Sequence, residues 1–335
     1  MSEANPQITI IVPVFNKRKY LDRALISILH QEFCDNECIL VDDGSFDGSE
    51  SICDHYAQID SRFRVFHIKK QGVSHARNLA LSNARGEYVV FIDGDDEVNS
   101  TYLSNLMQIK REHNPDLVIS WICSLDEQGK IHQKPFPIEP GAYDFNEMAG
   151  SFADLQFRSG IFGWCVSKLI PFELIKDIRF DEDLKLAEDL DFYIKVYSKI
   201  STIYMDNAAN YYYRQNTDNS SVRKDDEIDY VSQLRLLIRM KDLLVKKNVW
   251  ESDNKRIIEA KVLDYAYFSI FHCDFSRFNS CFGGVYALLM DANLEKHNAP
   301  GFKGMIISSL MKYDVKRAKM LVGLYRFCRR MAKRR

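Results

Sequence analysis

The sequence has no long apolar stretch and no paired cysteine motif. No segment of the 335 residues approaches the roughly 20 apolar residues that a membrane-spanning helix needs. The eight cysteines are scattered, and Cys34 and Cys38, which lie closest together, lack the second pair that a zinc site requires. Residues 1–7 are polar, so no signal peptide is expected. We therefore expect a cytoplasmic protein with reduced cysteines.

Glycine-rich phosphate-binding loops are also missing. The first apolar segment is followed by Phe15-Asn-Lys-Arg18 instead of G-x-G-x-x-G, and no G-x-x-x-x-G-K-[ST] occurs anywhere. These absences exclude the dinucleotide-binding fingerprint and the P-loop. They also argue against a sugar-nucleotide pyrophosphorylase, which would carry a glycine-rich loop at this point. If the protein binds a diphosphate, we expect a metal ion to take the place of a glycine cradle.

Charge is unevenly distributed along a nearly neutral chain. The formal net charge is −2, yet residues 316–335 hold nine Lys or Arg and no acid. On a helix, this segment has an apolar face of Ala318, Leu321, Val322, Leu324 and Tyr325 and a basic face of Lys319, Arg326, Arg330 and Lys333. Such a helix can lie on an anionic membrane surface, and the alternative is a solvated basic terminus packed against the acidic remainder of the protein. Nucleic acid is not an expected partner, because only this tail is basic.

The N-terminal half alternates between strand-like and helix-like patterns. Strands are expected at residues 8–14, 37–41, 63–68 and 88–92. Asn16 and Asp47 are expected to cap the helices that follow the first two strands. Such an alternation predicts right-handed βαβ units, and hence an α/β fold with a mostly parallel central sheet flanked by helices.

Polar groups follow three of these strands. The first strand ends at Pro13-Val-Phe-Asn16, the second at Asp42-Asp43, and the fourth at Asp93-Gly-Asp-Asp96. Because the carboxyl ends of parallel strands share one edge of a sheet, these groups can converge on a polar, phosphorylated ligand. Clustered carboxylates repel each other, and a hard cation such as Mn²⁺ or Mg²⁺ suits their oxygens. The alternative is a solvated acidic turn.

Four segments in this order resemble the motifs of a known enzyme family. They are Val12-Pro-Val-Phe-Asn16, Val41-Asp-Asp-Gly-Ser-Phe-Asp47, Gly72-Val-Ser-His-Ala-Arg-Asn78 and Phe91-Ile-Asp-Gly-Asp-Asp96. Together they are similar to the inverting glycosyltransferase family two, which has the GT-A fold and includes many enzymes of bacterial polysaccharide synthesis.

The resemblance implies roles on the nucleotide side of a donor site. The backbone of Pro13, Val14 and Phe15 would line a nucleobase pocket. Asp42 would accept a hydrogen bond from the base, as suits uracil, and Arg77 would lie near the base or the diphosphate. Asp43 is expected to orient its own loop, because Gly44 and Ser45 make a turn there.

The resemblance also assigns the Asp-x-Asp motif. Asp93 and Gly94 would lie near the ribose and the sugar. Asp95 would bind the metal, with Asp93 as the second candidate ligand. Asp96 extends the motif and is a further candidate for the metal.

A second acidic stretch lies at Glu188-Asp189. Ala187 to Phe192 resembles the family's Glu-Asp motif at the start of a helix under the acceptor site. The resemblance implies that Asp189, with Glu188 beside it, is the general base that takes the proton of the acceptor hydroxyl. By position alone, both residues are also what the dipole of a helix N-terminus favours.

The segment Tyr211–Ser220 resembles a family segment in which a Tyr-Arg strand end precedes a flexible loop. Arg214 is therefore a candidate diphosphate contact, and the loop is expected to order over the bound donor.

These features predict a transferase domain over residues 1–222 and a helical extension over residues 223–335. The predicted activity is metal-dependent, inverting transfer of a hexose or N-acetylhexosamine from a nucleotide diphosphate sugar, with UDP as the expected nucleotide. The predicted acceptor is a hydroxyl of a growing glycan, free or lipid-linked. The alternatives are a nucleotide-sugar hydrolase, a nucleotidyltransferase, and a non-catalytic nucleotide- or glycan-binding module. Peripheral contact with the inner face of the cell membrane is expected through the basic tail.

Overall fold

The computed structural model describes residues 5–126, 128–133, 135–215, 229–273, 275–291, 306–307 and 309–332. The chain forms two compact units. The first comprises residues 1–148 and 155–221, and the second comprises residues 149–154 and 222–335. The first unit has the predicted α/β fold, with a largely parallel central sheet flanked by helices.

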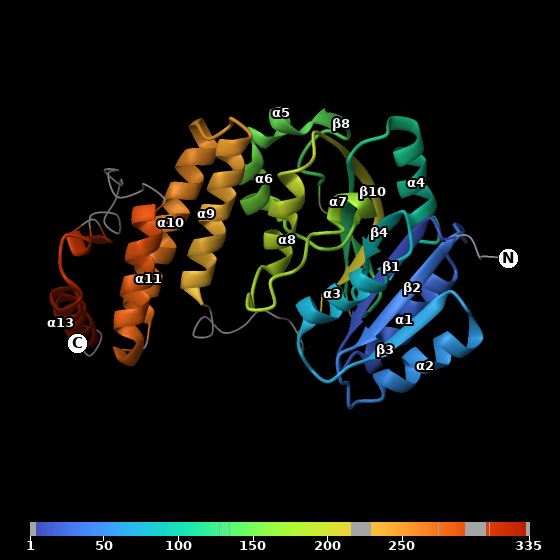
Figure 1. Ribbon diagram of the computed structural model, residues 1–335, viewed down its shortest axis with the longest axis horizontal. Coiled ribbons are helices and arrows are strands. Elements are labelled where there is room, and N and C mark those ends of the chain that lie inside the picture. The colour runs from blue at the N-terminus through green and yellow to red at the C-terminus, as the bar shows by residue number, and fades with distance from the viewer. Residues whose placement is uncertain are drawn as a thin grey trace. The chain divides into compact units, whose positions relative to one another are not determined.

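Four parallel strands carry the predicted motifs and lie side by side in the order β3-β2-β1-β4 (Figure 1). They are Phe63–His67, Asn36–Asp42, Ile8–Val14 and Tyr88–Phe91, respectively. Every residue of β2 is buried, as expected of a central strand whose two faces are both covered. The helices between these strands are α1 (Arg18–Leu29), α2 (Ser49–Ile59) and α3 (Val73–Asn83). The predicted alternation of strands and helices is confirmed.

The sheet continues beyond β4 with strands of both directions. The strand β9 (Lys168–Pro171) lies between β4 and β6 (Leu117–Leu125) and runs antiparallel to both. The strand β10 (Thr202–Arg214) runs parallel to β6. The end of β10 pairs with β5 (Glu97–Val98), which attaches the segment after the predicted Asp-x-Asp motif to a second strand.

The remaining elements of this part of the chain are short strands and helices. Two strands, β7 (Ile131–His132) and β8 (Gly141–Asp144), run antiparallel to β6 and β10, respectively. The helices are α4 (Tyr102–His113), α5 (Phe145–Ala149), α6 (Phe152–Ser159), α7 (Phe172–Ile175) and α8 (Glu188–Tyr197).

The two predicted helix caps differ from expectation. Lys17, and not Asn16, precedes the first residue of α1. Asn16 has a φ of 52°, and its Oδ1 accepts a hydrogen bond from Phe46 N at 3.1 Å. Because this oxygen is bound to the loop after β2, the prediction of Asn16 as a cap was wrong. Asp47 lies one position before the cap of α2, where its Oδ1 accepts a hydrogen bond from Ser49 N at 3.0 Å.

The second unit is helical. It contains α9 (Tyr230–Lys246), α10 (Ser252–His272), a 3₁₀ turn (Phe275–Arg277), α11 (Phe278–Asp291) and α13 (Val315–Ala332). The helices α9, α10 and α11 contact one another, and α13 contacts α10 and α11. The buried Asn254 donates to Ala149 O at 2.7 Å and accepts from Ala153 N at 2.9 Å, which attaches residues 149–154 to this unit.

The apolar face predicted for the C-terminal helix is divided between protein and solvent. Ala318 and Val322 are buried, and Tyr325 Oη lies 3.1 Å from Tyr267 Oη of α10. Leu321 is 38% exposed and its neighbour Met320 is 61% exposed. On the predicted basic face, the side chains of Arg326, Arg330 and Lys333 lie outside the part that the structure describes. Among the described residues, no helix combines the length and the apolar character needed to cross a bilayer.

Candidate active site

Asp43, the first residue after β2, connects the end of β1 to the segment before α3. Asp43 N donates to Val14 O at 2.8 Å, and the Asp43 carboxylate accepts hydrogen bonds from Gln71 N at 2.6 Å and Gly72 N at 2.8 Å. Asp43 therefore fixes the start of α3 as well as its own loop. This agrees with the loop-orienting role expected for it.

Asp42 is buried and already has two partners. Its Oδ1 accepts from Ser45 N at 3.1 Å, and its Oδ2 lies 3.0 Å from His67 Nδ1. The other ring nitrogen of His67 lies 3.0 Å from Asp54 Oδ1. Partial burial acts to lower the pKa of His67, but the two carboxylates outweigh it and raise the pKa. Asp42, which was predicted to bind the base, is thus held in a fixed orientation.

The residues predicted to line the base pocket include an aromatic pair. The Phe15 ring follows Pro13 and Val14 at the end of β1 and lies 6.2 Å from the ring of Phe46. Phe46 is 82% exposed, and Lys70 Nζ lies 3.8 Å from the centre of the Phe15 ring. This surface offers an apolar ring face and a cation, which suit a nucleobase and a phosphate, respectively.

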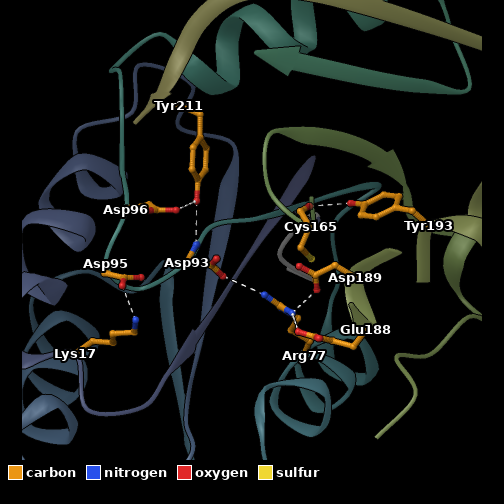
Figure 2. Close-up of polar contacts among 10 residues, drawn as sticks. All are labelled: Lys17, Arg77, Asp93, Asp95, Asp96, Cys165, Glu188, Asp189, Tyr193 and Tyr211. Carbon is orange, nitrogen blue, oxygen red and sulfur yellow. Dashed lines mark hydrogen bonds and ion pairs between the residues drawn. The ribbon is translucent and has the colours of Figure 1, made fainter. Parts of the chain in front are cut away.

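The Asp93–Asp96 turn is held from two sides. Tyr211 Oη accepts from Asp93 N at 3.2 Å and donates to Asp96 Oδ2 at 2.7 Å (Figure 2). Asp96 Oδ1 accepts from Arg214 N at 2.8 Å. Burial, with Asp93 and Asp95 nearby, raises the pKa of Asp96 well above its ordinary value. At Gly94, an added Cβ would lie 3.3 Å from Pro13 O, so a side chain there would crowd the end of β1. These contacts favour a structural role for Asp96 and Gly94.

Arg77 connects the two predicted acidic motifs. Its guanidinium donates to Asp189 Oδ1 at 2.6 Å and Asp93 Oδ1 at 3.1 Å, and lies 3.5 Å from Glu188 Oε1 (Figure 2). The residue is only 3% exposed. Its guanidinium carbon lies 5.3 Å from the centre of the Phe180 ring. Because both terminal nitrogens contact carboxylates, the contacts favour a bridging role for Arg77 over direct contact with the base.

Asp189, the predicted general base, has a raised pKa. Burial raises its pKa to about 7, even though the Arg77 guanidinium acts to lower it. A carboxylate with a pKa near neutrality is a better base than an ordinary one and is still ionised in a substantial fraction of molecules. Glu188 lies beside it, on the same guanidinium nitrogen.

The start of α8 is fixed by unusual backbone and by α3. Ala187, directly before Glu188, has a left-handed φ of 61°, a conformation that costs a non-glycine residue about 1–2 kcal/mol. Asn78 Nδ2 donates to Phe180 O at 3.0 Å, and Phe180 N donates to Asn78 Oδ1 at 2.9 Å. The ring of Phe180 stacks on Phe192 of α8, with centroids 4.1 Å apart. The helix that carries Asp189 is therefore attached to the helix that carries Arg77.

Asp95 and Arg214 contact residues other than Arg77 at the Asp93–Asp96 turn. Asp95 Oδ2 accepts a hydrogen bond from Lys17 Nζ at 2.5 Å (Figure 2). Arg214 is buried, pairs with Glu97, and donates from Nε to Asp95 O at 3.3 Å. The loop predicted to order over the donor falls on residues 216–220, outside the described residues.

Asp95 and Asp93 fit a divalent cation that reaches the site together with a diphosphate. Within the described ranges, no three His, Cys, Asp or Glu side chains converge as a protein-only metal site. Mg²⁺ and similar ions commonly use one or two carboxylates and take their other ligands from substrate phosphates and water. Asp95 and Asp93 supply two such carboxylates on one turn, whereas both oxygens of Asp96 accept hydrogen bonds within the fold. The donor set therefore suits Mn²⁺ or Mg²⁺.

Three residues of this site were not assigned a role from the sequence. Lys17 holds Asp95, Tyr211 holds the Asp93–Asp96 turn, and Asn78 holds the segment before α8. Lys17 lies shortly after the end of β1, at the sheet edge that was predicted to bind the ligand. This position in the sequence could have indicated a role for Lys17. For Tyr211 and Asn78, the contacts join segments far apart in the chain, and spacing gives no signal for them.

The chain is similar to known glycosyltransferases. Residues 9–164 match the model of glycosyl transferase family 2. Glycosyltransferase GlyG of Streptococcus pneumoniae is 33% identical over 216 residues, which cover 62% of this chain and 70% of that protein. Cholesterol galactosyltransferase of Borreliella burgdorferi is 30% identical over 271 residues, which cover 79% of this chain and 75% of that protein.

The fold has a counterpart among solved structures. The crystal structure of S. aureus TarS 1–349 in complex with UDP-GlcNAc superposes with a TM-score of 0.68 and 22% sequence identity. The match covers 96% of this chain and 91% of that chain. The predicted enzyme class and fold are thereby confirmed. This chain is a glycosyltransferase and belongs to glycosyl transferase family 2.

Proposed function

We propose that this glycosyltransferase moves a sugar from a nucleotide diphosphate sugar, with UDP as the nucleotide, to a hydroxyl of a growing glycan, and inverts the anomeric carbon. One observation carries the proposal: Arg77 contacts both Asp93 and Asp189. One guanidinium thus binds both Asp93, a carboxylate of the predicted donor side, and Asp189, the predicted base. Support for the donor comes from TarS, whose structure contains UDP-GlcNAc.

In the proposed reaction, Asp189 accepts the proton of the acceptor hydroxyl as that oxygen attacks the anomeric carbon. Arg77 holds the carboxylate in orientation, and its charge keeps part of the Asp189 population ionised at neutral pH. Glu188 adds negative charge beside the base. Pro13, Val14, Phe15 and Asp42 contact the nucleotide, and Asp93 lies near the sugar.

The leaving group is a nucleoside diphosphate. A divalent cation bound at Asp95 and Asp93 would supply positive charge to the diphosphate oxygens. Arg214 supports this site, because its Nε donates to the backbone oxygen of Asp95 and its backbone N donates to the carboxylate of Asp96.

Donor turnover tests this function. Purified protein with Mn²⁺ and a panel of UDP-, GDP- and dTDP-sugars is expected to release nucleotide slowly from one UDP-sugar, and EDTA is expected to stop the release. Asp95→Asn is expected to remove this chelator-sensitive activity and to leave the thermal unfolding midpoint close to that of the wild type. Asp253→Asn, at a side chain that is 69% exposed in the second unit, serves as a matched control and should change neither quantity.

The same assay separates the alternatives. Turnover that is insensitive to both EDTA and Asp95→Asn would contradict the metal assignment. A hydrolase would release nucleotide equally fast with and without a glycan acceptor, whereas a transferase is accelerated by its acceptor. Donor binding without turnover, in the presence of acceptor glycans, would favour a non-catalytic binding module.

We also propose that α13 contacts an anionic membrane surface at the inner face of the cell membrane, where lipid-linked acceptors would be reached. The exposed Met320 and Leu321 lie in the same helix as Lys316 and Lys319, and basic residues near anionic lipid contribute about 1 kcal/mol each. The protein is expected to float with phosphatidylglycerol vesicles, but not with phosphatidylcholine vesicles, in a density gradient. The double variant Met320→Glu, Leu321→Glu should lose this association, and Tyr286→Glu, at an exposed position of α11, should retain it. Equal flotation of all three proteins would exclude α13 as the contact.

A further inference from the structure

Lys17 is a basic residue of the donor site that the proposed mechanism leaves without a role. Its Nζ donates to Oδ2 of Asp95, the carboxylate proposed as the metal ligand (Figure 2). The side chains of Lys17 and Asp95 are 23% and 14% exposed, so water screens their attraction only in part. A cation of the protein itself therefore occupies one of the oxygens that a metal ion would use.

The backbone of Lys17 and Arg18 is fixed by the loop after β2 and by the first residue of α2. Lys17 N donates to Ser49 Oγ at 2.8 Å, and Arg18 N donates to Asp47 Oδ2 at 3.0 Å. Lys17 O accepts from Leu21 N at 2.8 Å in the first turn of α1. With the backbone held in this way, the flexible four-carbon stem of Lys17 is the part that can move. The ammonium can leave Asp95 by a change of rotamer, without rearrangement of the loop.

The charges of the turn favour a metal ion that arrives with phosphate. Asp93 is paired with Arg77, and Asp95 is paired with Lys17. A divalent cation that approaches Asp95 alone is repelled by the ammonium on the same carboxylate. A cation that carries a nucleotide diphosphate brings negative oxygens, to which an ammonium binds strongly.

We propose that Lys17 and the divalent cation bind Asp95 in turn. Lys17 pairs with Asp95 until a metal ion arrives with the donor diphosphate, and its ammonium then passes to the diphosphate. Lys17 is thus a diphosphate-binding residue of the donor complex, and it makes metal binding depend on nucleotide. This inference rests on the proposed function, in which Asp95 binds the metal.

Mn²⁺ binding without nucleotide is the first test, with free Mn²⁺ measured by electron paramagnetic resonance during titration. Lys17→Met is expected to tighten Mn²⁺ binding by about tenfold, because the competing cation is gone. Lys17→Arg keeps a cation and is expected to bind Mn²⁺ as weakly as the wild type. Lys69→Met removes an exposed lysine from the loop after β3 and serves as the control for a general change of charge.

Addition of UDP gives the second measurement. In the wild type, UDP is expected to strengthen Mn²⁺ binding, and Mn²⁺ must strengthen UDP binding by the same factor, because coupling between two ligands is reciprocal. In Lys17→Met this factor is expected to fall by about tenfold or more, since Mn²⁺ no longer displaces an ammonium and UDP has lost a contact.

An unchanged Mn²⁺ affinity in Lys17→Met would overturn the inference. Asp95→Asn, titrated with Mn²⁺ and UDP, then shows which premise has failed. If this variant loses Mn²⁺, the metal assignment stands and only the role of Lys17 is wrong. If it binds Mn²⁺ like the wild type, the metal assignment of the proposed function falls as well. The thermal midpoint of each variant verifies its folding, and Lys17→Gln replaces Lys17→Met if the latter does not fold.

Discussion

Replacing Asp189 with Asn is expected to lower kcat for sugar transfer by about 100- to 10,000-fold, which is the contribution of a general base. The amide has the shape of the carboxylate and can still accept the hydrogen bond that Arg77 donates to Oδ1. It cannot take the proton of the acceptor hydroxyl. The residues proposed to contact the nucleotide are unchanged, so the donor dissociation constant, measured by calorimetry, is expected to stay within about twofold of the wild-type value.

Two controls make this prediction specific. Glu188→Gln alters the neighbouring carboxylate, which lies farther from Arg77, and is expected to reduce kcat much less. In the wild type, the rate should fall as the pH drops below about 7, because burial raises the pKa of Asp189 to about 7 and the protonated form cannot act as a base. The residual activity of Asp189→Asn should lack this acid limb. A collapse of donor affinity in Asp189→Asn would instead place Asp189 in the donor site.

The strands and their polar ends could be predicted from the sequence because local pattern determines both. A central strand such as β2 is covered on both faces, so its middle, Cys38 to Val41, is a continuous apolar run, and polar residues follow at Asp42 and Asp43. The segment that ends in Asp93 to Asp96 follows the same rule. Parallel pairing then brings these ends to one edge, which is why residues of separate motifs could be expected to lie together.

The contacts between motifs could not be predicted, because they depend on the packing of segments far apart in the chain. Arg77 and Asp189 are 112 residues apart, and they meet because Asn78 and Phe180 attach the start of α8 to α3. The insertion of β9 between β4 and β6 is likewise antiparallel and non-local. Nothing in the spacing of residues distinguishes such an insertion from continued parallel pairing.

The surroundings of the C-terminal helix could not be predicted for a different reason. An amphipathic pattern has the same period whether the apolar face meets lipid or protein. In the structure, Ala318 and Val322 face protein, while Met320 and Leu321 remain exposed. The pattern therefore predicted the helix, but it could not divide its apolar residues between these two environments.

Replacing Arg77 with Met is expected to destabilise the protein as well as to reduce transfer. Loss of one member of a buried ion-pair network commonly costs about 3–5 kcal/mol, because the remaining charges lose their partner. Here we expect about 3 kcal/mol, the lower end of that range, because the side chains of Asp93, Glu188 and Asp189 keep 34%, 18% and 26% exposure to water. For a domain of this size, thermal unfolding should shift down by about 6–12 °C.

The pH profile of the remaining activity distinguishes an electrostatic role of Arg77 from a purely structural one. The guanidinium acts to lower the pKa of Asp189, so its removal should raise that pKa further and move the acid limb of the rate to higher pH. Arg77→Lys keeps the positive charge but cannot bind two carboxylates through separate nitrogens of one planar group. We expect this variant to move the acid limb of the rate less than Arg77→Met does, and to lower the unfolding temperature in part. If Arg77→Met lowers the unfolding temperature but leaves the limb in place, then Arg77 supports the fold of the site without tuning its base.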